Sequence, residues 1–140
     1  MSETHVKGRV LRSIGAVLVG FFTTFILSVG TDLMCHATGA FPAWGQPMSH
    51  ALFILATVYR AIYTIAGGYV TARLAPNRPM GHALTLGIVG LFAAIAGTVA
   101  TWDKGPEFGP KWYPLALVVL AIPCVWFGGT LGQNRKRTSA

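Results

Sequence analysis

Asp32 and His36 are the residues whose types and spacing first suggest chemistry. They stand four positions apart, so on a continuing helix both side chains lie on one face, with Cys35 adjacent. His50 opens the next apolar stretch of the chain. A carboxylate and imidazoles so placed can bind a divalent metal or relay protons. Because no signature motif accompanies them, we expect interfacial polar residues. Proton or substrate handling and metal binding are the alternatives, so no metal ligand is assigned and the cofactor stays open.

A second candidate is Arg60, the only charged residue between Ala51 and Ala72. At a helical rise of about 1.5 Å per residue, it lies roughly 15 Å from His50 and roughly 20 Å from Arg73, near the middle of a bilayer. A guanidinium at that depth costs at least about 2.5 kcal/mol. We therefore expect Arg60 to have a buried partner, water or a ligand.

Few groups are available to pair with Arg60. Asp32 and Asp103 are the carboxylates closest to a membrane boundary, and both are expected at its outer edge, within reach of an arginine that extends toward the interface. Tyr63 offers a neutral hydroxyl one turn away. Three interpretations follow: Arg60 joins helices as a structural residue, it forms an anion or substrate site, or it lies on a lipid-facing or subunit surface.

The elements that carry these residues are apolar segments. Apolar residues make up 53% of the chain and charged residues 11%, against about 25% charged in soluble domains, and the mean hydropathy is +0.55. Four runs reach the roughly 20 residues that a helix needs to cross the hydrocarbon core; they cover approximately residues 10–31, 49–72, 83–102 and 112–131. The sequence predicts an all-α, polytopic integral membrane protein, a four-helix transmembrane bundle forming one transmembrane domain over residues 1–140.

The charges predict how this bundle is oriented. With four crossings, most basic residues fall on one side: Lys7, Arg9, Arg12, Arg73, Arg78, Arg135, Lys136 and Arg137. By the positive-inside rule that side is cytoplasmic, and both termini lie there. We therefore interpret the net charge of +7 as a topology signal with contacts to anionic lipid, and expect no nucleic-acid partner. The predicted location is the bacterial inner (plasma) membrane.

The second run has two different faces when it is drawn as a helix. The face centred on Arg60 collects small, polar and aromatic residues: Phe53, Ala56, Thr57, Tyr63, Thr64, Gly67 and Thr71. The opposite face carries larger aliphatic and aromatic residues: Leu55, Val58, Ile62, Ile65 and Tyr69. Small and polar residues favour contacts between membrane helices, so we expect Arg60 to point into the bundle.

Glycine spacing marks where helices approach closely. We assign helix packing to Gly67, Gly68, Gly90, Gly97, Gly128 and Gly132. A substrate path lined by these glycines is the alternative. Gly67-Gly68 is echoed by Gly128-Gly129, which suggests two similar helical hairpins.

No motif of soluble enzymes is present in the chain, neither a phosphate-binding glycine loop, a nucleophile elbow nor an HExxH helix. We first expect a small oligomeric transporter or channel-like protein that uses Arg60 with Asp32, His36 and Tyr63. The second hypothesis is an accessory or assembly subunit of a larger membrane complex, and the third is a membrane-embedded enzyme. The expected partners are the lipid bilayer and either further copies of the chain or a larger membrane complex.

Overall fold

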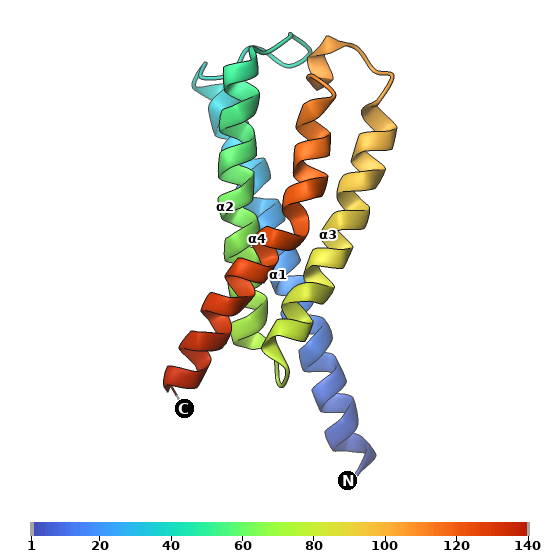
Figure 1. The fold of residues 1–140 in the computed structure, drawn as a ribbon, viewed down its shortest axis with the longest axis vertical. Helices are drawn as coiled ribbons and strands as arrows, with labels where there is room; N and C mark the ends of the chain where they lie inside the picture. The colour runs from blue at the N-terminus through green and yellow to red at the C-terminus, as the bar shows by residue number, and fades with distance from the viewer. Residues whose placement is uncertain (1, 140) are drawn as a thin grey trace.

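The chain folds into four long helices. The computed structural model describes residues 2–139, and its helices are α1 (Glu3–Ala37), α2 (His50–Leu74), α3 (Pro79–Thr101) and α4 (Trp112–Ser139), with a short 3₁₀ helix, η1 (Pro106–Phe108), between α3 and α4. All four long helices are long and apolar enough to cross a membrane, and they pack side by side (Figure 1). The predicted all-α bundle of four apolar helices is confirmed.

Two helices are longer than the apolar runs that predicted them. α1 begins at Glu3 and continues to Ala37, beyond the expected residues 10–31, and α4 continues to Ser139 instead of ending near 131. Hydropathy locates the part of a helix that lies in lipid, whereas lysine, arginine and glutamine are good helix formers that extend the same helix into water. The extension of α1 matters for the site because it places Asp32 inside a helix.

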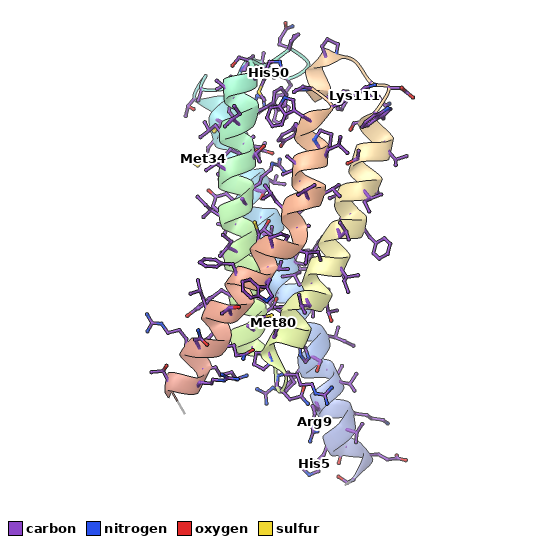
Figure 2. All side chains as sticks on the ribbon, in the orientation of Figure 1. His5, Arg9, Met34, His50, Met80 and Lys111 are labelled. Atoms are coloured by element: carbon purple, nitrogen blue, oxygen red, sulfur yellow. The ribbon has the colours of Figure 1, made fainter. Side chains whose placement is uncertain are left out.

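Both termini lie at the same end of the bundle, together with the turn between α2 and α3, and the other two connections lie at the opposite end (Figure 1). Figure 2 shows His5 and Arg9 at the end with the termini, and His50 and Lys111 at the other. An even number of crossings accounts for this arrangement.

α2 packs most extensively, against α4 and α1 and to a smaller extent against α3. Its buried residues are Phe53, Ala56, Tyr59, Gly67, Gly68, Thr71 and Ala72, whereas Leu55, Val58 and Ile62 are exposed. The predicted division of α2 into two faces is thus largely confirmed. Ile65 and Tyr69 depart from it, because they are half-buried against α4.

Glycines permit the closest contacts between helices. A Cβ on Gly68 would lie 2.7 Å from the carbonyl oxygen of Val125 in α4, and one on Gly132 would lie 2.7 Å from the carbonyl oxygen of Tyr69 in α2. On the other side of α2, a Cβ on Gly67 would lie 2.8 Å from the carbonyl oxygen of Gly20 in α1. These distances are too short for any side chain, so backbone meets backbone at both crossings.

Gly90 and Gly97 of α3 differ from the expectation that they pack against another helix. A Cβ on either residue would have no atom within 4 Å among the described residues. α3 packs against α4 through other positions, since a Cβ on Gly87 would lie 2.5 Å from the Val125 side chain. A Cβ at Gly90 or Gly97 thus meets no other helix of this chain, and packing of these two glycines between subunits stays a prediction.

α4 changes direction part-way along its length (Figure 1). Pro123 lies inside this helix. A proline lacks the amide hydrogen of a helical bond and its ring crowds the preceding turn, which bends the helix. α4 contacts α2 on both sides of Pro123, through Tyr113 and Phe53 before it and through Gly132 and Tyr69 after it.

Candidate functional site

Asp32 joins α1 to α2 through both of its carboxylate oxygens. The Tyr59 hydroxyl donates a hydrogen bond to Oδ1, and Nη2 of Arg60 donates to Oδ2 and forms an ion pair with it. The side chains of Arg60 and Asp32 are 30% and 21% exposed, respectively. Asp32 lies more than one helical turn before α1 ends, which brings it within reach of Arg60.

Further hydrogen bonds extend this contact along α1 and α2. The hydroxyls of Thr31 and Tyr63 lie 2.8 Å apart, and Thr24 donates to the Tyr63 carbonyl oxygen at 3.1 Å. Deeper in the bundle, Thr71 donates to the carbonyl oxygen of Ala16 at 3.1 Å. A polar seam thus holds two apolar helices together in a fixed register, where each unpaired polar group would be costly.

His36 contacts the connection that follows α1. Its Nδ1 lies 2.7 Å from the carbonyl oxygen of Pro42, and its ring stacks on Trp44 at a centroid distance of 3.6 Å. His36 therefore anchors the connection between α1 and α2. Within residues 2–139, no group of three or more His, Cys, Asp and Glu side chains is arranged to hold a metal ion.

His50 and Asp103 have other surroundings. His50, at the start of α2, accepts a hydrogen bond from the indole nitrogen of Trp112 at 3.0 Å. Asp103 is exposed in the connection between α3 and α4. Of the candidate residues, the structure thus brings Arg60 and Asp32 into contact and packs Tyr63 against Tyr59, whereas His36 and His50 bind other partners.

A cavity of about 490 Å³ lies beside Arg60, between the four helices. Its volume falls in the range of small-molecule sites, about 300 to 1,000 Å³. The wall is mainly apolar, and its polar groups are Arg60, the Tyr113 phenol and the hydroxyls of Thr24, Ser28, Thr64, Thr98 and Thr101. Gly90, Ala94 and Gly97 of α3 form part of the wall. An apolar chamber with a few polar groups is typical of a ligand site.

The cavity opens on the side of the bundle between α1 and α3. Its lining includes exposed residues of both helices, among them Phe25 and Val29 of α1 and Ala93 and Gly97 of α3. α1 and α3 are not consecutive in the chain, and they contact each other less than α1 contacts α2. In a bilayer, a gap in this position faces lipid.

The guanidinium of Arg60 is only partly satisfied by the protein. Its Nε is buried and has no hydrogen-bond acceptor among residues 2–139, whereas Nη2 is held by Asp32. A buried donor without an acceptor costs about 1 to 3 kcal/mol, and more when the group is charged. The site therefore combines a fixed cation, an unused donor and an adjoining apolar chamber.

No protein-family model matches this chain, and neither a curated protein nor a solved structure is significantly similar to it. The function is therefore inferred from the geometry of the chain itself.

Two residues of the site were missing from the sequence-based candidates. Tyr59 is buried and its hydroxyl donates a hydrogen bond to Asp32. Its position next to Arg60 turns it by about 100° around α2, so it falls outside the face centred on Arg60. Tyr113, near the start of α4, lines the cavity. A single sequence contains no pattern that predicts the bond between Tyr59 and Asp32 or the position of Tyr113 at the cavity.

Proposed function

We propose that the chain is a small membrane transporter that binds a lipid-soluble substrate in the cavity, with Arg60 as the recognition residue. One observation carries this proposal: the Arg60 side chain, which Asp32 holds in place, is 30% exposed and lines the cavity. A substrate oxygen in the cavity can accept a hydrogen bond from this side chain, and a hydrogen bond to a charged group contributes about 1.5 to 3 kcal/mol.

Asp32 and Tyr59 position Arg60 in this proposal. Asp32 of α1 accepts hydrogen bonds from Tyr59 and Arg60, which both lie on α2. This contact between two helices restricts the rotamers of the long arginine side chain. A recognition group that is already ordered loses less entropy when a ligand binds. Tyr63 supports the same arrangement through its bond to Thr31. Arg60, Asp32 and Tyr63 thus remain site residues in the proposal, and His36 does not.

Mass spectrometry of co-purified small molecules tests this assignment. We expect a species bound to the wild type to be depleted in Arg60→Gln and in Gly97→Leu, which places a side chain in the cavity. Gly30→Leu in α1 is the matched control, since a Cβ there also meets no atom within 4 Å and Gly30 is not part of the cavity wall. The species identified is then followed across the membrane of proteoliposomes. Identical inventories in all four proteins would contradict the proposal.

The accessory-subunit hypothesis is favoured by a different observation. Asp32 already neutralises Arg60 and joins α1 to α2. Under this hypothesis, the ion pair stabilises the fold and binds no substrate. In that case, native purification should recover a stoichiometric partner, and Asp32→Asn should deplete the assembled complex. A wild type purified alone that moves its bound species across a bilayer would exclude this candidate.

We also propose that both termini face the cytoplasm of a bacterial cell. The basic residues flanking the helices and the position of both termini at one end support this orientation (Figure 1). Self-association and the similarity of the two helical hairpins stay predictions.

A further inference from the structure

The ligand class can be deduced from the charges and shape of the cavity, given the proposed function. We infer that the cavity takes a neutral lipid-soluble molecule with an apolar chain and one carbonyl-type oxygen. The oxygen accepts from Arg60, and the chain lies along α3 after entering between α1 and α3. This inference rests on the proposed function and adds the chemistry of its substrate.

Charge balance favours a neutral ligand. Arg60 and Asp32 form an ion pair whose formal charges cancel. An anion beside Arg60 would also be near the carboxylate of Asp32, and it would leave the site with a net negative charge in surroundings of low dielectric constant. Like charges about 4 Å apart repel by about 4 kcal/mol at an effective dielectric constant of 20, in addition to the desolvation of the anion. A neutral oxygen avoids both costs.

Arg60 defines the polar end of the ligand. Its side chain is 30% exposed and lines the cavity, and a carbonyl oxygen can accept a hydrogen bond without bringing a charge. Tyr113 lines the same cavity. A carbonyl-type group can accept from these two side chains, whereas a pure hydrocarbon offers them no acceptor.

The wall of α3 defines the apolar end. Gly90 and Gly97 are seven residues apart, so they lie on nearly the same face of the helix, with Ala94 between them. A Cβ on either glycine would have nothing within 4 Å among residues 2–139, and all three residues line the cavity. A glycine inside a helix costs about 0.5 to 1 kcal/mol relative to alanine. Here the two glycines leave this part of the cavity wall without side chains, and Gly97 is exposed on the side that faces lipid.

Photocrosslinking in phosphatidylcholine nanodiscs tests the inference. The probe is methyl palmitate with a diazirine in its chain, and labelled sites are located by mass spectrometry. We expect saturable labelling of the segment Gly90–Thr101. Unlabelled methyl palmitate should compete about tenfold better than hexadecane or hexadecanesulfonate, a difference of about 1.4 kcal/mol.

Variants separate the polar end from the apolar end. Gly97→Leu should abolish saturable labelling while the protein stays folded, because the Cβ of the new side chain meets no described atom within 4 Å and the rest of it extends into the cavity that Gly97 lines. Gly30→Leu, with the same change in α1, should be labelled like the wild type. Arg60→Gln should lower the competition by methyl palmitate to the level of hexadecane.

The outcomes also separate this inference from the proposed function. Better competition by hexadecanesulfonate than by methyl palmitate would overturn the neutral ligand but leave the cavity as a substrate site. Equal competition by hexadecane would remove the role of the oxygen. Unchanged labelling of Gly97→Leu would show that the probe does not enter the cavity, and the proposed function would fail with it.

Discussion

Gly128 of α4 lies directly against the backbone of α2 at Ile65. A Cβ on Gly128 would be 2.8 Å from the carbonyl carbon of Ile65 and 2.9 Å from the amide nitrogen of Tyr69. Main-chain atoms cannot turn away as a flexible side chain can, so any side chain at this position must separate the two helices. This contact fixes the distance between α2 and α4, two of the helices that enclose the cavity.

Gly128→Ala should therefore destabilise the protein. Overpacking a close contact costs about 1 to 3 kcal/mol, which exceeds the gain of about 0.5 to 1 kcal/mol from removing a helical glycine. The midpoint of unfolding, measured in detergent by circular dichroism, should fall.

Gly97→Ala is the matched control, with the same chemical change on α3. Because a Cβ at Gly97 has no atom within 4 Å among the described residues, only the gain in helix propensity remains. Its midpoint should stay equal or rise. A fall in Gly97→Ala as large as that in Gly128→Ala would show that α3 packs through this glycine.

The pair of Asp32 and Arg60 should show strong coupling in a double-mutant cycle. Asp32→Asn leaves the Arg60 charge without its ion-pair partner, which should cost about 3 kcal/mol, the lower end of the range for buried pairs, because both side chains are partly exposed. The double variant Asp32→Asn, Arg60→Gln has no such charge and should recover part of the loss, with a coupling free energy of about 0.5 to 3 kcal/mol. Additive losses in unfolding titrations would contradict a direct interaction.

The bundle itself was predictable, because an apolar run of about 20 residues satisfies its backbone hydrogen bonds in lipid by forming a helix. The inward face of α2 followed from helical periodicity, since Phe53, Ala56, Gly67 and Thr71 recur on one side. Asp32 was expected at the edge of the membrane because the apolar run stops there. The helix continues to Ala37, and this continuation aligns Asp32 with Arg60.

The sequence offered a path lined by glycines only as an alternative to helix packing, and it could not decide between the two for a physical reason. Gly90 and Gly128 are equivalent in a sequence, as glycines in apolar helices. A Cβ on Gly128 would clash with α2, whereas one on Gly90 would meet no described atom within 4 Å. Whether a glycine of α3 contacts another helix depends on the distance between α3 and α1. Many weak contacts determine that distance together. His36 likewise turned to Pro42 and Trp44 of a connection whose path the sequence did not specify.

Lys136 should stabilise the C-terminal end of α2. Its ammonium group donates a hydrogen bond to the carbonyl oxygen of Ala75, the buried residue after α2 ends. A hydrogen bond from a charged donor contributes about 1.5 to 3 kcal/mol, and a cation also suits the negative end of the helix dipole. In Lys136→Met, hydrogen exchange of the amides in residues 72–75 should accelerate.

Arg137→Met is the control for this prediction, because Arg137 is exposed on the next position of α4. It removes the same charge and should leave exchange in residues 72–75 unchanged. Equal acceleration in both variants would point to the overall charge of this end and not to the bond with Ala75.

The proposed orientation can be measured with single cysteines in a background carrying Cys35→Ala and Cys124→Ala. Ala43→Cys and Asp103→Cys lie in exposed connections at one end of the bundle, and Asn77→Cys and Thr138→Cys lie exposed at the other. Because basic residues concentrate at the second end, a membrane-impermeant maleimide should label the first pair in intact cells. The second pair should react only after permeabilisation. Labelling of Ala43→Cys together with Thr138→Cys in intact cells would contradict four crossings, and labelling of only the second pair would invert the orientation.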